Sequence, residues 1–247
     1  SITIDEASAN TDNLSVDYAA SADSAVTITV AGSDTDADND VAVSVGDITV
    51  ADNAGALTVS SAGEADNSID AFTADDVASI TVDATSMGLT QTGAFSAAGA
   101  TSASFTATAD TLTIADGSTI TLTDATSITV SAIGGAASLG SITTDEDALA
   151  TITASGAEAN DVTIDDLDMD HATTVTLSAL AGADITLDTI TLAGIDSAGD
   201  DVDLEIVVSA EEDSTVTVSD VTETTNATET TIDLITVSGA GTFSFTA

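Results

Sequence analysis

Residues 111–132 read TLTIADGSTITLTDATSITVSA, and this stretch decides the fold class. Apolar residues alternate with Thr or Ser in three short runs, and turns that contain Asp separate the runs. Alternation of this kind with β-branched residues predicts half-buried strands that carry apolar side chains on one face and hydroxyls on the other. The stretch therefore predicts three short β-strands joined by tight turns.

The same alternation continues along the whole chain and predicts an all-β protein. Strand-like runs begin roughly every ten residues, which is typical of a sandwich, a barrel or a solenoid. Only Ala71–Ala78 (AFTADDVA) suggests a short helix. Other runs with the alternation are AVTITV at 25–30, SITV at 79–82, SASFTA at 102–107, DITLDTITL at 184–192 and STVTV at 214–218.

Two features favour a parallel β-solenoid, a β-helix-like coil, over residues 71–247. The chain has five Phe, one Tyr and no Trp, so its core is filled mainly by slim aliphatic side chains, as suits a narrow coil. The segments SITVDATS at 79–86 and SITVSAIG at 127–134 resemble degenerate repeats. Tandem immunoglobulin-like β-sandwiches are the alternative, because they show the same alternation. Residues 1–70 are expected to form an N-terminal β region and are a candidate for a separate small β domain.

Charge is the most unusual property of the composition. The 247 residues include 43 Asp and Glu but no Lys or Arg, which gives a formal net charge of −43. Intramolecular salt bridges are nearly impossible in such a chain, and its carboxylates repel one another. Counter-charge must come from solution, and calcium suits the chain because it takes about six to eight oxygen ligands. The mean hydropathy of +0.32 and the regular apolar pattern indicate a folded protein and not a disordered one.

The most distinct candidate metal site is the loop that carries Asp34, Asp36, Asp38 and Asp40. Carboxylates at alternate positions can converge on one hard cation, as in the first half of an EF-hand loop. The loop departs from the EF-hand because Asn39 replaces the usual Gly and Val45 replaces the bidentate Glu. The loop is either a calcium site of another kind or a solvated acidic turn.

A second candidate cluster contains Asp166, Asp168 and Asp170. In a strand, these three carboxylates point to one face, and Leu167 and Met169 point to the other. The cluster predicts either a calcium site or a solvated acidic face. The neighbouring His171 is the only histidine, and with no Cys present it cannot build the usual kind of zinc site.

The composition excludes several function classes and leaves catalysis without support. Nucleic acid is excluded because phosphate binding needs Lys and Arg, and no run of apolar residues is long enough to cross a membrane as a helix. The G-x-S-x-G elbow is absent, so we expect the protein not to be an enzyme. Asn13 and Asn226 lie in N-glycosylation sequons. The absence of Cys, Lys and Arg indicates an extracellular protein at the cell surface, where resistance to trypsin-like proteases is useful.

Three runs show the typical texture of the chain: SITVDATS (79–86), TLTIADGSTITLTDATSITVSA (111–132) and DITLDTITLAG (184–194). In composition and in these runs, the chain resembles bacterial and archaeal surface-layer (S-layer) proteins and related calcium-dependent adhesins. The resemblance covers nearly the whole chain, although the glycine-rich nonapeptide of RTX calcium repeats is absent. It implies an extracellular structural protein that self-assembles into a surface layer, sheath or filament stabilised by divalent cations. Expected partners are further copies of the chain and a cell-surface glycan.

Three other functions remain open from the sequence, of which the last in rank is a polysaccharide-active enzyme that uses a pair of aspartates. The chain could be an adhesin segment that binds glycans or surfaces. Alternatively, Thr-x-Thr motifs such as Thr119–Thr123 and Thr189/Thr191 resemble the threonine ranks of ice-binding β-solenoids. Those ranks need a flat face and a constant coil length, whereas the motifs are irregularly spaced along this sequence.

Overall fold

The computed structural model describes most of the chain as strands and turns. Within the described residues there is no helix. The described residues are 2–5, 14–17, 25–34, 40–51, 55–63, 65–144, 150–169, 172–192, 204–223 and 232–246.

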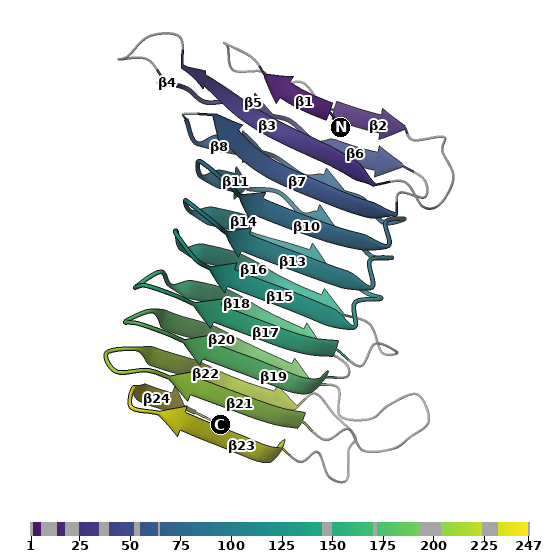
Figure 1. The fold of residues 1–247 in the computed structure, drawn as a ribbon. Coiled ribbons are helices and arrows are strands. Elements are labelled where there is room, and N and C mark those ends of the chain that lie inside the picture. Colours follow the sequence, from purple (N-terminus) through teal and green to yellow (C-terminus); the bar gives the residue numbers. More distant parts are fainter. Residues whose placement is uncertain are drawn as a thin grey trace.

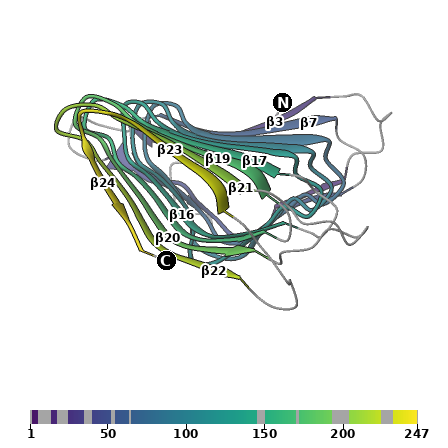
Figure 2. The ribbon, with the colours of Figure 1, turned by 90° about the horizontal axis from the view of Figure 1, so that it is seen from below.

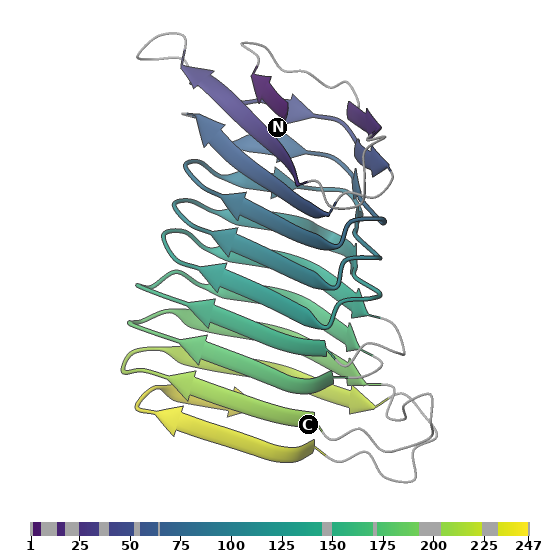
Figure 3. The same ribbon diagram turned by 45° about the vertical axis from the view of Figure 1, so that its right-hand side comes forward.

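One sheet, here called sheet A, lies at the front in Figures 1 and 3. Its strands stack in the order β1-β3-β7-β10-β13-β15-β17-β19-β21-β23, and β4 pairs with β3. These strands are β1 (Ile2–Asp5), β3 (Val26–Asp34), β4 (Asp40–Val41), β7 (Ala56–Gly63), β10 (Ser79–Ala84), β13 (Ser102–Ala107), β15 (Ser127–Ala132), β17 (Ala150–Gly156), β19 (Ala172–Ala179), β21 (Leu204–Ala210) and β23 (Ile232–Gly239).

The second sheet, sheet B, lies behind sheet A and forms the other layer of the molecule (Figure 2). Its main path is β2-β6-β9-β12-β14-β16-β18-β20-β22-β24, and the short strands β5, β8 and β11 pair beside it. These strands are β2 (Leu14–Asp17), β5 (Ser44–Val45), β6 (Ile48–Ala51), β8 (Asn67–Ile69), β9 (Phe72–Thr73), β11 (Leu89–Gln91), β12 (Phe95–Ser96), β14 (Leu112–Thr121), β16 (Ala137–Thr144), β18 (Val162–Met169), β20 (Asp184–Leu192), β22 (Thr215–Glu223) and β24 (Thr242–Phe245).

The chain alternates between the two sheets, so that each turn adds one rung to the stack. Every described pair of strands is parallel except β3–β4. The all-β prediction and the parallel β-solenoid prediction are therefore confirmed. The alternative of immunoglobulin-like sandwiches is wrong, because their sheets are antiparallel.

The short helix suggested over Ala71–Ala78 is also wrong. Phe72–Thr73 forms strand β9, and Asp75 and Asp76 lie in a turn. Phe72 is buried and stacks on Phe95 of the next coil, with ring centroids 4.9 Å apart. Pairing and burial between coils thus override the local helical tendency.

Strands before and after residue 70 belong to the same two sheets, and a separate domain over residues 1–70 stays a prediction.

The core lies between the sheets and consists of stacked columns of inward side chains. One column runs from Val26 through Ile80 and Ile128 to Ile206, and every member is at most 4 % exposed. Burying one such aliphatic side chain contributes about 1.5–3 kcal/mol. Phe105 of sheet A meets Phe95 of sheet B edge to face across this interior, at 5.6 Å between centroids.

Two buried amides, Asn67 and Gln91, also lie in this core. The Asn67 amide nitrogen donates to the carbonyl oxygens of Val30 and Ala62, and its oxygen accepts a bond from the Val43 N–H. Gln91 accepts a bond from the Ala115 N–H and donates to three carbonyl oxygens, those of Asp70, Gly93 and Ala94. These bonds satisfy backbone groups that irregular turns leave without ladder partners.

The core columns are open at the last described rung. Ile235 and Val237 of β23 are 36 % and 52 % exposed, whereas Ile206 and Val208, their partners on β21, are fully buried. A parallel strand laid along β23, from this chain or from a second copy, would cover both side chains.

Candidate binding surfaces

Two columns of outward residues, nearly all of them hydroxyl-bearing, run along the outer face of sheet A. The register shifts of this sheet lie outside the columns, between Ala150 and Thr151 and between Leu204 and Glu205. We call the two columns the first rank and the second rank. The first rank consists of Thr27, Thr58, Thr81, Ser104, Thr129, Thr153, Thr176, Val207 and Thr236. The second rank consists of Thr3, Thr29, Ser60, Asp83, Thr106, Ser131, Ser155, Ser178, Ser209 and Ser238.

The central coils have nearly constant length, which keeps the ranks straight. From Thr58 to Thr176, successive members of the first rank are 23, 23, 25, 24 and 23 residues apart. The Thr-x-Thr motifs look irregular in the sequence because outward Thr residues of both sheets are interleaved there. In space, the outward Thr and Ser residues of sheet A fall into the two ranks.

Sheet A carries little charge on its outer face. Among strands β7, β10, β13, β15, β17 and β19 the one carboxylate is Asp83. It lies in the second rank between Ser60 and Thr106, and its Oδ1 is buried without a hydrogen-bond partner. The central part of sheet A, from β7 to β19, is therefore an almost neutral surface on a strongly acidic chain.

The outer face of sheet B bears the predicted Asp166 and Asp168. Leu167 and Met169 between and after them are fully buried, so the expected division of this strand into two faces is confirmed. Ser141 donates to Asp166 at 3.0 Å, and Asp168 lies between Thr143 and Thr191 of the adjacent strands. The two carboxylates thus have hydroxyl neighbours across the ladder. Asp170 lies outside the described residues.

The two ends of the other predicted cation site, Asp34 and Asp40, lie at the edge of sheet A. Asp34 ends β3 and Asp40 begins β4, and the two residues are paired in the antiparallel register. The backbone therefore brings the two ends of the acidic loop together, as a chelating turn requires. Asp36 and Asp38 lie outside the described residues, as do the sequon residues Asn13 and Asn226.

Carboxylates at the corners of the coils have a role that the sequence analysis missed. Asp161 accepts the N–H of Asp184 in the next coil at 2.9 Å, and Asp184 accepts the N–H of Thr215 in the coil after that at 2.8 Å. Asp66 does the same for the Gly88 N–H at 3.0 Å. Each carboxylate satisfies a backbone donor one coil further along the stack. The sequence signal was an Asp directly before or at the first position of a sheet B strand.

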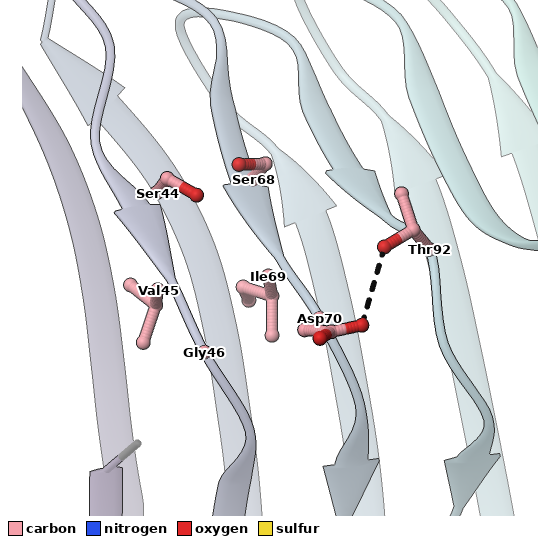
Figure 4. Close-up of a pocket in the computed structure, with 7 residues that line it drawn as sticks. All are labelled: Ser44, Val45, Gly46, Ser68, Ile69, Asp70 and Thr92. Carbon is pink, nitrogen blue, oxygen red and sulfur yellow. Dashed lines mark hydrogen bonds between the residues drawn. The ribbon is translucent and has the colours of Figure 1, made fainter. Parts of the chain in front are cut away.

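A shallow pocket opens on sheet B beside β5 and β8 (Figure 4). Its volume is about 270 Å³, slightly below the roughly 300–1,000 Å³ of typical ligand sites. Asp70 is the one carboxylate in its lining, and Thr92 donates to it at 3.5 Å. The lining therefore holds no acid–base pair. The pocket residues are Ser44, Val45, Gly46, Ser68, Ile69, Asp70 and Thr92.

Neither a metal-binding group of side chains nor a membrane-spanning helix is present in the described part of the chain. No three His, Cys, Asp or Glu side chains group there in a way that could hold a metal ion. None of its segments is a helix long and apolar enough to span a membrane. In comparisons with known proteins, no family model, curated protein or solved structure matches this chain. Arguments about function therefore rest on the surfaces themselves.

Proposed function

We propose that the protein is an extracellular structural protein that assembles with copies of itself into a surface layer, sheath or filament, and that divalent cations, calcium first, stabilise the assembly. The carrying observation is the charge of the stack, which combines 43 acidic residues with no Lys or Arg. Copies of such a chain repel one another unless solution cations bridge or screen their carboxylates. Calcium accepts carboxylate, carbonyl and water oxygens together, which are the ligands this surface offers.

The solenoid itself supports a structural role. Two continuous parallel ladders over one apolar core make a rod in which each coil is held by its neighbours. Strand edges offer a route for contact between copies, because an unpaired edge can accept a strand from another chain. Cations at the Asp34–Asp40 turn would favour such contact by lowering the local negative charge.

The test is negative-stain electron microscopy and sedimentation velocity of the purified chain. Samples would contain calcium, EDTA, or NaCl at matched ionic strength. We expect ordered sheets or filaments with calcium and their loss on chelation, and NaCl should not replace calcium. Compact monomers under all three conditions would refute self-assembly, and assemblies that survive prolonged EDTA would refute the cation requirement.

Two double variants of equal charge locate the cation effect. Asp36→Asn with Asp38→Asn removes two carboxylates from the predicted calcium loop, and Glu212→Gln with Asp213→Asn removes two exposed carboxylates from a coil corner. The loop variant should need more calcium to assemble than the corner variant. Equal calcium requirements would show that the loop is a solvated turn.

A further inference from the structure

The two ranks of sheet A form a regular two-dimensional net of hydroxyl groups. Neighbouring strands lie about 4.8 Å apart, and alternate residues along a parallel strand lie about 6.6 Å apart. From β3 to β23 the ranks pass over nine strands, a length of about 40 Å at that strand spacing. Neighbouring strands change direction only gradually (Figures 1 and 3), so the spacings of the net are kept from one coil to the next while the stack turns along its length (Figure 2).

The net is rigid as well as regular. Threonine is stiff about χ1 because its Cβ is branched, and strand packing restricts that angle further. In the second rank, hydroxyl groups bond to each other along the stack: Ser131 and Ser155 are 3.1 Å apart, and Thr29 and Ser60 are 3.3 Å apart. Little side-chain entropy remains to be lost when an ordered partner binds.

The chemistry of this face restricts its partner. A face without basic residues does not bind phosphates or other anions, and with Asp83 as the one carboxylate of its central strands it has little attraction for cations. A second protein is also disfavoured, because serine is depleted in protein interfaces and this face has no aromatic or large apolar anchor in its ranks. A fitting partner is neutral, planar and periodic, and it offers both hydrogen-bond donors and acceptors.

Ice has these properties. Its surface is an uncharged array of water molecules, each of which can donate and accept, and planes of hexagonal ice repeat at distances close to the two spacings of the net. We propose that the outer face of sheet A binds ice crystals through the first and second ranks. The hydroxyls hold water at lattice positions, and the threonine methyl groups between them limit the exchange of that water with bulk solvent.

Sheet B provides a built-in comparison for this proposal. Its outward positions also carry hydroxyls, such as Thr163 and Thr186, which are paired across β18 and β20. However, Asp166 and Asp168 interrupt its outer face, and its register shift between Ile114 and Thr119 falls within strand β14, whereas the shifts of sheet A lie outside its ranks. A lattice match should therefore be confined to sheet A.

The test measures thermal hysteresis and adsorption to a growing ice hemisphere with the purified full chain. The first variant carries Thr129→Tyr and Thr153→Tyr, which place bulky rings in the centre of the first rank. The matched control carries Thr163→Tyr and Thr186→Tyr on sheet B. We expect the unmodified chain to adsorb to ice and to lower the freezing point below the melting point. The sheet A variant should lose both effects, and the sheet B variant should keep them.

Two outcomes would overturn the proposal: no adsorption or hysteresis by the unmodified chain, or equal loss in the two tyrosine variants when circular dichroism shows both folded. A third variant, which should fold readily, keeps the test decisive if the tyrosine variants fail to fold. Asp83→Thr places a hydroxyl at the Asp83 position of the second rank and removes a buried carboxylate oxygen without a partner, so thermal hysteresis should rise. A folded Asp83→Thr protein with reduced thermal hysteresis would contradict the assignment. Ice binding and cation-driven assembly are independent, since the ice variants leave the Asp34–Asp40 turn unchanged and sedimentation scores assembly separately.

Discussion

Sheets A and B pack on the same core and are built from the same alternating pattern, yet they differ in regularity and charge. Sheet A receives one strand from each central coil, whereas early coils of sheet B contain two short strands, such as β8 with β9 and β11 with β12. Strands β18 and β20 of sheet B carry five carboxylates, whereas β17 and β19 of sheet A carry none. The comparison teaches that the net charge of −43 is not spread evenly over the surface.

The largest effect should come from breaking the core that the two sheets share. Phe95→Ala removes a ring that stacks on Phe72 and meets Phe105 of sheet A edge to face. We expect a loss of about 3–5 kcal/mol in the free energy of unfolding, because the cavity cannot close fully. Urea denaturation checks this value. Thr106→Ala on the outer face is the control and should change stability by less than about 0.5 kcal/mol.

The next effect should come from the buried amide that links the sheets. Asn67→Ala deletes bonds to Val30 and Ala62 of sheet A and to the Val43 N–H. Each buried group left unsatisfied costs about 1–3 kcal/mol, so we expect a total loss of about 3 kcal/mol in unfolding free energy after partial relaxation. A change below about 0.5 kcal/mol, the size typical of surface substitutions, would show that these bonds contribute nothing net.

A smaller effect should separate the carboxylates of the two outer faces. Asp83→Thr on sheet A should stabilise the fold by about 1 kcal/mol, because it removes an unpartnered buried oxygen and adds a good strand former. Asp168→Thr on sheet B should stay within about 0.5 kcal/mol, since Asp168 is exposed. Thermal unfolding of both variants at the same ionic strength makes the comparison. Equal shifts would mean that the two faces do not differ in this respect.

An effect of similar size should appear at the corners of sheet B. Asp184→Ala removes the acceptor of the Thr215 N–H. We expect it to lower the free energy of unfolding by about 1 kcal/mol, which is less than the loss of a buried hydrogen bond to a charged group, because Asp184 is exposed. Asp220→Ala, at an exposed outward position of β22, is the control and should change stability by less than about 0.5 kcal/mol. Amide hydrogen exchange at Thr215 should quicken only in the Asp184 variant, and unchanged exchange there would refute the capping role.

The alternation in the sequence was enough to predict strands, faces and the solenoid class, because a period of two determines which side chains are buried. It correctly placed Leu167 inward and Asp168 outward. It could not reveal the two ranks, because even on the central strands successive members are 23 to 25 residues apart, and which strand pairs with which depends on tertiary contacts. The helix suggested at Ala71–Ala78 failed for the same reason, since Phe72 is held by a partner in another coil.

The central claim is that outward residues of sheet A are aligned in straight ranks, and one measurement tests it directly. The chain has no cysteine, so Ser131→Cys with Ser155→Cys introduces a single thiol pair at positions whose hydroxyls are 3.1 Å apart. We predict that mild oxidation closes an intramolecular disulfide, seen as loss of free thiol without dimer formation. The offset pair Thr129→Cys with Ser155→Cys should stay reduced, because its Cα atoms are roughly 8 Å apart. A matched pair that stays reduced, or an offset pair that closes as readily, would contradict the aligned ranks.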